Sequence, residues 1–248
     1  MMVYHLRAIF ATAQRILRQL SHDHRSVALI FLVPVVLMTL LWWLYSDNEL
    51  IFNHIAPALL GIFPFTIMFL ITSITTLRER TNGTLERVLV TPIAKLDIII
   101  GYTIAFGLLA VAQSLVASGV AIFFLDMNVA GPEWFVITIA LSDALLGTAL
   151  GLFVSAFART EFQAVQFMPA LIFPQLLLCG LLLPLAQMPD VLESIAYYLP
   201  LTYAVDALQR VSVETTLSSE AWRDIWVVLA FIFVAVLLGA ATLRRKSR

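Results

Sequence analysis

Charged residues are scarce in this chain of 248 residues. Aspartate, glutamate, lysine and arginine make up 12% of it, whereas hydrophobic residues make up 61%. A soluble domain carries about a quarter charged and about half apolar residues, so this composition excludes an ordinary soluble domain and indicates an integral membrane protein. The net charge of −1 identifies no partner, because the two signs of charge lie in different segments and cancel only in the total.

Cysteine and histidine are scarce as well. Cys179 is the single cysteine, which excludes an intramolecular disulfide. Because it lies in an apolar run, we expect a packed small residue rather than a reactive thiol. Of the four histidines, His22 and His24 flank Asp23, but such closely spaced ligands without supporting residues make a weak metal site. We therefore expect no metal site and no membrane enzyme built on histidines or carboxylates.

Two sequence signals are missing. No G-x-x-x-x-G-K-[ST] phosphate-binding loop occurs, and no expected cytoplasmic loop is long enough for a nucleotide-binding fold. Arg7, Arg15 and Arg18 interrupt the first twenty residues, so no signal peptide is expected. We therefore predict one transmembrane domain, residues 1–248, that is not an enzyme, and any ATP chemistry would belong to another chain.

Long apolar runs dominate what the sequence does contain. A helix needs about 20 apolar residues to cross about 30 Å of hydrocarbon. The six runs that qualify are 27–45, 55–76, 98–125, 135–158, 162–183 and 225–243. Before them, residues 3–20 repeat apolar residues at helical spacing with arginines between, which predicts an amphipathic helix in the membrane interface, with a soluble helix as the alternative. The predicted fold is an all-α polytopic membrane protein with one interfacial helix and six transmembrane helices.

Lysine and arginine predict the orientation. Six spans place both termini on one side, which then holds thirteen basic residues against Arg210 and Arg223 on the other. The thirteen are Arg7, Arg15, Arg18, Arg25, Arg78, Arg80, Arg87, Lys95, Arg159, Arg244, Arg245, Lys246 and Arg248. The positive-inside rule makes their side cytoplasmic. We therefore predict that both termini are cytoplasmic.

The long outer segment, residues 184–224, has a pattern of its own. Within it, residues 188–199 and 203–213 alternate apolar and polar residues at near-helical spacing. We predict two short helices that dip partly into the outer leaflet and cap an exit.

The densest charge lies in the cytoplasmic segment, residues 77–97. Asn82-Gly83 favours a turn, and residues 84–90 then fit a short helix that Thr84 caps and Pro92 ends. Its apolar ridge and flanking charges suit contact with a soluble partner. The alternative is an ordinary positive-inside loop.

Two blocks of sequence resemble the ABC-2 type ABC-transporter permeases. The first is Arg-Thr-Asn-Gly-Thr-Leu-Glu-Arg at 80–87, followed by Thr91-Pro92. The second comprises Cys179-Gly180, Leu183-Pro184, Met188-Pro189 and residues 198–208. The resemblance covers essentially the whole chain. Cys179 departs from it where the family more often has serine, and Gln209 where it often has arginine.

The resemblance implies a permease that dimerises, by default with a second copy of this chain, and is driven by two copies of a cytoplasmic ATP-binding subunit. ATP and magnesium would bind that subunit, and no cofactor this chain. Residues 83–90 would form the coupling helix and residues 3–20 the elbow helix, in the cytoplasmic (inner) membrane of a prokaryotic-type cell. Membrane lipid, and no nucleic acid, is expected around the chain. The expected ATPase-coupling residues are Arg80, Gly83, Thr84, Leu85, Glu86, Arg87, Leu89 and Pro92.

The same resemblance indicates a cargo pathway, since spans two and five line the cavity between the two subunits in this family. Their aromatic and amide side chains are candidates to contact a lipophilic drug, a lipid or a lipid-linked cargo. These residues are Phe63, Phe65, Phe69, Gln166, Phe167, Phe173 and Gln175. For each one, contact with lipid or internal packing is the alternative.

Asp143 is the only acidic residue well inside an apolar run. It shares a helix face with Gly147 and Gly151, and this G-x-x-x-G spacing permits close helix approach. Asp143 should therefore face protein, neutral or hydrogen-bonded, with Gln113 or Ser114 as candidate partners. A packing contact is the favoured interpretation. The alternative function for the chain is a secondary transporter or channel with Asp143 as its proton or cation site, although such a protein would require several ionisable groups.

Overall fold

The computed structural model describes residues 2–84 and 93–242, which form helices and connecting loops without a β-strand. The long helices are α1 (Met2–His22), α2 (His24–Leu44), α3 (Glu49–Thr81), α5 (Lys95–Phe123), α6 (Glu133–Val154), α7 (Glu161–Leu178) and α10 (Ser219–Ala241). Three shorter elements are the 3₁₀ turn η1 (Leu185–Gln187), α8 (Asp190–Ala196) and α9 (Pro200–Val213).

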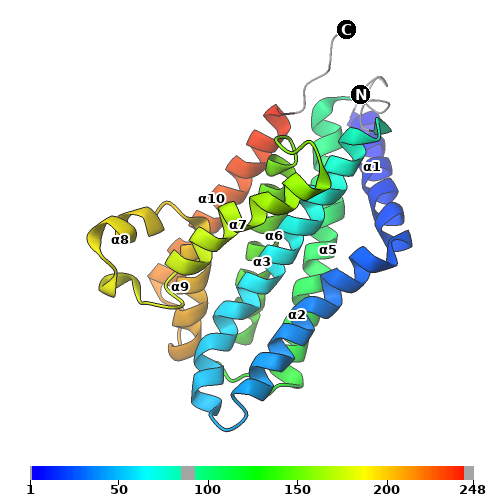
Figure 1. Cartoon of the computed structure of the whole chain (residues 1–248). Helices are drawn as coiled ribbons and strands as arrows, with labels where there is room; N and C mark the ends of the chain where they lie inside the picture. The colour runs from blue at the N-terminus through cyan, green and yellow to red at the C-terminus, as the bar shows by residue number, and fades with distance from the viewer. Residues whose placement is uncertain (1, 85–92, 243–248) are drawn as a thin grey trace.

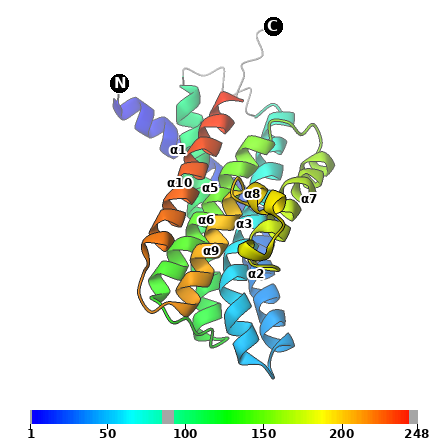
Figure 2. The same ribbon diagram turned by 90° about the vertical axis from the view of Figure 1, so that its left-hand side faces the viewer.

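The long helices stand side by side, and the chain runs up and down between two ends of the bundle (Figure 1). The start of α1, the end of α3, the start of α5 and the end of α10 lie together at one end (Figures 1 and 2). It is called here the basic end, because Arg7 lies near the start of α1 and Arg78 and Arg80 lie in the last turn of α3. The α2–α3 turn and the α5–α6 loop lie at the opposite end. This arrangement is the one that two termini on the same side require.

In the described part of the chain, five helices are long and apolar enough to cross a membrane: α2, α3, α5, α6 and α10. The sixth predicted span, 162–183, corresponds to α7, which is not among these five. Glu161, Gln163, Gln166 and Gln175 make α7 more polar than the others, and the helix ends at Leu178. The prediction of six continuous spans therefore holds for five of them.

The return from the basic end to the opposite end is divided between α7 and α9. With 18 residues at 1.5 Å each, α7 is about 27 Å long. The chain then leaves the bundle at Gly180, whose φ of +91° suits glycine, and residues 179–199 project sideways with α8 (Figure 1). The start of α9 lies beside the end of α7, where the Leu201 amide donates a hydrogen bond to Oε1 of Gln175 at 3.4 Å.

The two short helices predicted within residues 184–224 are both present. The pattern at 188–199 corresponds to α8, Asp190–Ala196, and the pattern at 203–213 to α9, Pro200–Val213. α9 packs against α3, α6 and α10, and Leu201, Val205 and Leu208 on it are fully buried. It is therefore part of the bundle wall rather than a surface cap.

α3 is the central helix, and α6 packs on it more closely than on any other helix. A Cβ on Gly147 would lie 2.1 Å from the backbone oxygen of Phe65, and one on Gly151 would lie 2.6 Å from that of Phe69. No side chain fits these gaps. The predicted close approach through Gly147 and Gly151 is confirmed, with α3 as the partner helix.

The N-terminal helix is amphipathic as predicted. Ile9, Ala13, Ile16 and Leu20 are buried on α1, while its Arg18 is exposed. α1 packs mainly on α5. Near Gly101 the two helices almost touch, since a Cβ there would lie 2.6 Å from Cβ of Thr12.

We predict that Gly147→Ala destabilises the bundle, since its new methyl group would overlap the Phe65 carbonyl and force α6 away from α3. Overpacking of this kind costs about 1–3 kcal/mol, which a thermal melt of the purified protein measures. Gly119→Ala on α5 is the control, because a Cβ there meets nothing within 4 Å. Equal melting temperatures for the two variants would contradict this account of the α3–α6 contact.

Candidate functional site

The predicted coupling residues fall at the basic end, at the edge of what the structure describes. Gly83 has a φ of +70°, so the predicted turn at Asn82-Gly83 is confirmed. Thr84 is the last residue described before residue 93. The coupling residues that lie outside the described ranges are Leu85, Glu86, Arg87, Leu89 and Pro92.

Three side chains tie the helix ends together around this segment. Nη1 and Nη2 of Arg15 on α1 donate to the two carboxylate oxygens of Glu79 on α3, at 2.7 and 2.8 Å. The hydroxyl of Tyr102 on α5 also donates to Glu79, and Nη2 of Arg15 lies 3.3 Å from that hydroxyl. This group is called the Arg15–Glu79–Tyr102 cluster.

The cluster is a buried ion pair. Glu79 is 2% exposed, and a buried carboxylate is stable only when it is paired and hydrogen-bonded. The two-pronged geometry of Arg15 supplies this pairing and fixes orientation. Burial alone would lower the pKa of Arg15, but the hydrogen bond and the charge of Glu79 act in the opposite direction and outweigh burial, so that the pKa is raised overall. Arg15 therefore stays charged and holds α1 to α3.

A second contact joins α1 to α5. Nδ1 of His5 lies 2.8 Å from Oδ2 of Asp97, and Asp97 is 5% exposed. The same carboxylate oxygen accepts from the Ala94 amide at 3.3 Å, at the start of α5. α5, the helix that follows the coupling segment, is thus held to α1 by two contacts, one between His5 and Asp97 and one between Arg15 and Tyr102.

Arg78 makes the corresponding contact on the other side of α3. It donates to both oxygens of Glu161 at the start of α7, at 2.6 and 2.9 Å, and lies 3.5 Å from Asp23. The hydrogen bond from Arg78 lowers the pKa of Glu161. All three groups are partly exposed, so this bridge is worth less than the buried cluster.

Sequence reasoning did not single out the Arg15–Glu79–Tyr102 cluster. Arg15 lies in the predicted amphipathic helix, and Glu79 lies in the charged segment. The two residues are 64 positions apart in the chain, so no local pattern connects them. The one available signal was the position of Arg15 beside the apolar face of α1. Nothing in the sequence marks Tyr102 as the third member.

Asp143 lies in the middle of the bundle and is fully buried. The expectation of Gln113 or Ser114 as its partner is wrong: Gln113 donates to the Ile30 carbonyl, and Ser114 to the Ala140 carbonyl. Among the described residues, neither oxygen of Asp143 has a hydrogen-bond partner. Oδ2 lies close to Gly61, where a Cβ would be 3.0 Å away, so Asp143 faces protein as predicted.

The expected cargo residues do not share one surface in this chain. Phe65 and Phe69 are fully buried beside α6, and Phe63 and Phe167 pack against the same core. Gln175 is 5% exposed and bonds to the Leu171 carbonyl and the Leu201 amide. Only Gln166 and Phe173 are exposed. Cys179 is buried, as expected of a packed small residue.

A pocket of about 430 Å³ lies beneath residues 179–199. Gly180, Pro184 and Tyr197 line one side of it, and Asp206 and Arg210 of α9 line the other. Arg210 is 3.0 Å from Asp206, so these two charges of the lining are paired with each other. Residues 179–199 therefore enclose a space rather than lying flat on the bundle.

Comparison with known proteins identifies relatives of this architecture. The family described as ABC-2 type transporter matches residues 7–212. ABC transporter G family member 20 of Dictyostelium discoideum is 26% identical over 82% of this chain and 28% of its own length. The probable multidrug ABC transporter permease YbhR of Escherichia coli is 24% identical over 77% of this chain and 52% of its own length.

Nodulation protein J of Rhizobium leguminosarum bv. viciae is 28% identical over 68% of this chain and 64% of its own length. The chain thus spans about half or less of the first two relatives.

We predict that Glu79→Gln and Arg15→Ala each destabilise the protein and that their effects are not additive, because both remove the same buried pair. Breaking such a pair costs about 3–5 kcal/mol, and the partial exposure of Arg15 reduces that figure. Thermal melts of the two single variants and the double variant form the cycle. Arg18→Ala, an exposed arginine on the same helix, is the control. Simple additivity would show that the two residues do not act as a pair.

Proposed function

The chain belongs to the ABC-2 type transporter family, and we propose that it is the transmembrane permease subunit of an ATP-binding-cassette exporter. In this proposal, two copies of a separate cytoplasmic subunit hydrolyse ATP with magnesium, and this chain carries the cargo pathway. The chain itself would bind no nucleotide, since its sequence has no phosphate-binding loop.

The observation that carries the proposal is the Arg15–Glu79–Tyr102 cluster. Residues 85–92 connect the end of α3 to the start of α5, and the cluster ties both of these helices to α1. A force applied to the connecting segment would therefore act on three helices as one unit. Such coupling also requires contacts that differ between the nucleotide-bound and nucleotide-free states.

A second copy of this chain is the proposed membrane partner. In α2, only 17% of the most apolar 18-residue window is buried, against 67% in α3. Trp43, Leu44 and Leu32 on α2 are more than half exposed. In a bilayer these side chains can face lipid, and α2 is also the helix most available to a second permease.

The proposed cargo is a lipophilic drug, a lipid or a lipid-linked molecule, moved outward across the cytoplasmic membrane. The word multidrug in the names of two relatives from Escherichia coli supports this class. The apolar character of the exposed residues near the pathway, such as Phe173 at 50% exposure, supports it too. The pocket beneath residues 179–199 lies where the cargo would leave.

We predict that the tagged protein, purified in mild detergent from its native cell, carries an ATP-binding subunit with ATPase activity. Replacing Leu85 and Glu86 by alanine should reduce the co-purified ATPase more than tenfold, since central contacts of this kind cost about 2 kcal/mol or more. Glu133→Gln at the opposite end is the control, as Glu133 is exposed there. A clean preparation without any ATPase would refute the coupling role.

Secondary transport through Asp143 is a second candidate function. It is favoured by the complete burial of the Asp143 carboxyl group, which has no hydrogen-bond partner among the residues that the structure describes. The two candidates give opposite predictions for Asp143→Asn in vesicles. For an ATP-driven exporter, both the transport rate and its dependence on pH should stay unchanged, because asparagine keeps the shape of the side chain. Loss of transport driven by a proton gradient would instead favour the second candidate.

A further inference from the structure

Arg80 at the end of α3 has no partner among the described residues. Its Nε is buried without a hydrogen bond, and no hydrogen bond or ion pair joins its side chain to residues 2–84 or 93–242. The acid nearest to it in sequence, Glu79, is already bonded to Arg15 and Tyr102. Within residues 2–84 and 93–242 the positive charge of Arg80 is therefore uncompensated, and an unpaired cation that is partly removed from water is costly.

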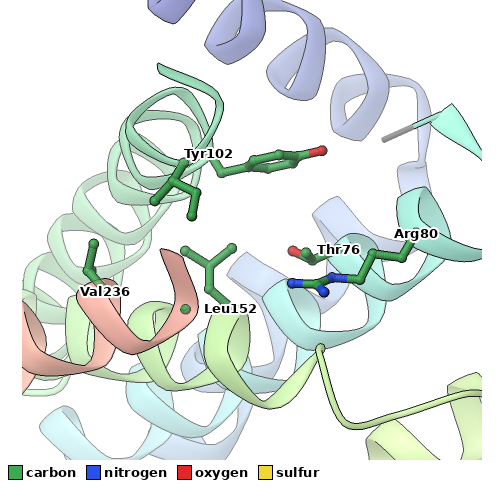
Figure 3. Close-up of a pocket in the computed structure, with 7 residues that line it drawn as sticks. Thr76, Arg80, Tyr102, Leu152 and Val236 are labelled. Carbon is green, nitrogen blue, oxygen red and sulfur yellow. The ribbon is translucent and has the colours of Figure 1, made fainter. Parts of the chain in front are cut away.

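The side chain of Arg80 points into a small cavity. Figure 3 shows its guanidinium group lying beside Thr76, directed toward Leu152, with the ring of Tyr102 across the space. Thr76 is 3% exposed, and its hydroxyl also lacks a hydrogen-bond partner. Nε of Arg80 and the hydroxyl of Thr76, both without a hydrogen-bond partner in the described residues, thus belong to side chains that lie beside each other.

The cavity admits one oxygen-sized atom. Its volume of about 20 Å³ is room for about one water molecule. An oxygen that accepts from Arg80 and from Thr76 would fill this space and satisfy both groups. An oxygen that also carries negative charge would neutralise Arg80, which water cannot do.

The cavity opens on a surface that suits lipid. Ile99 of α5 and Val236 and Gly239 of α10 line it on the side of these two helices. Next to them, Leu237 and Leu238 on α10 and Ile100 on α5 are 42–49% exposed. Because Gly239 lies two residues before α10 ends at Ala241, this lining is at the depth of lipid headgroups rather than in the hydrocarbon centre.

We propose that Arg80 and Thr76 bind one phosphate oxygen of an anionic phospholipid in the leaflet at the basic end, with the rest of the lipid on the apolar surface of α5 and α10. Guanidinium groups bind phosphate through several donors and shed water easily. The site needs neither ATP nor the ATP-binding subunit, so it stands independently of the proposed exporter function. Arg80 would then anchor the end of α3 to the membrane surface rather than to a soluble partner.

The experiment is native mass spectrometry of the delipidated chain, titrated with dioleoylphosphatidylglycerol, with dioleoylphosphatidylcholine and with inorganic phosphate. We expect the wild type to bind one phosphatidylglycerol about tenfold more tightly than phosphatidylcholine, because a charge-assisted contact is gained. Arg80→Gln should abolish this preference, and Arg80→Lys should keep part of it.

Two further variants make the result independent of folding defects. Gly239→Ala keeps the charge of Arg80 but narrows the cavity that Gly239 lines, and its new Cβ would make only ordinary contacts of 3.6–3.8 Å. We expect it to weaken the preference as well. Arg159→Gln, an exposed arginine at the basic end, should leave the preference unchanged.

Three results would overturn the proposal. Equal binding of both lipids by the wild type would assign the cavity to water. Competition by millimolar inorganic phosphate as strong as that of the lipid would assign it to a soluble anion. Loss of the preference when an ATP-binding subunit co-purifies would assign Arg80 to a carboxylate of that subunit.

Discussion

The close contact between α3 and α6 is the constraint on which the rest of the bundle depends. With no side chain at Gly147 and Gly151, the α6 backbone reaches the carbonyl groups of Phe65 and Phe69. Helices in a membrane gain little from excluding water and associate through such close packing. Once α6 lies on α3, the remaining faces of α3 are left for α2, α5, α7 and α9. The position of α3 in turn fixes where Glu79 and Arg80 emerge at the basic end.

Charge at that end is distributed unequally. Glu79 is neutralised by Arg15 and bonded by Tyr102, and Arg78 is bridged to Glu161 and Asp23. These contacts hold α1, α3, α5 and α7 together around the connecting segment. Arg80 lies among them without a counter-charge in the described part of the chain. The end of α3 therefore contains both a fully paired cluster and an unpaired arginine. We assign transmission of force to the Arg15–Glu79–Tyr102 cluster and lipid contact to Arg80.

Much of the architecture could be predicted from the sequence. Spans are set by the length of apolar runs, and the bilayer has one thickness, so α2, α3, α5, α6 and α10 followed directly. The turn at Gly83 and the glycine face of α6 followed from local rules as well. α7 did not, because its glutamines and prolines shorten the helix, and the remaining distance is covered by α9. Partners across the fold were also beyond prediction. Gln113 and Ser114, in the predicted span 98–125, were the candidate partners for Asp143, yet both bond to backbone carbonyl groups elsewhere.

The sequence by itself determined that this is a helical membrane protein, where its charged segments lie and which family it resembles. These properties depend on composition and on short patterns, because the preference of each side chain for water or for lipid is a property of that residue alone. Only the tertiary structure decided that Arg15, Glu79 and Tyr102 meet, that Phe65 and Phe69 are buried, and that α7 and α9 share one crossing. Each of these contacts depends on how helices that are far apart in the chain pack together. Contacts between residues 64 or 87 positions apart produce no pattern in the sequence around either partner.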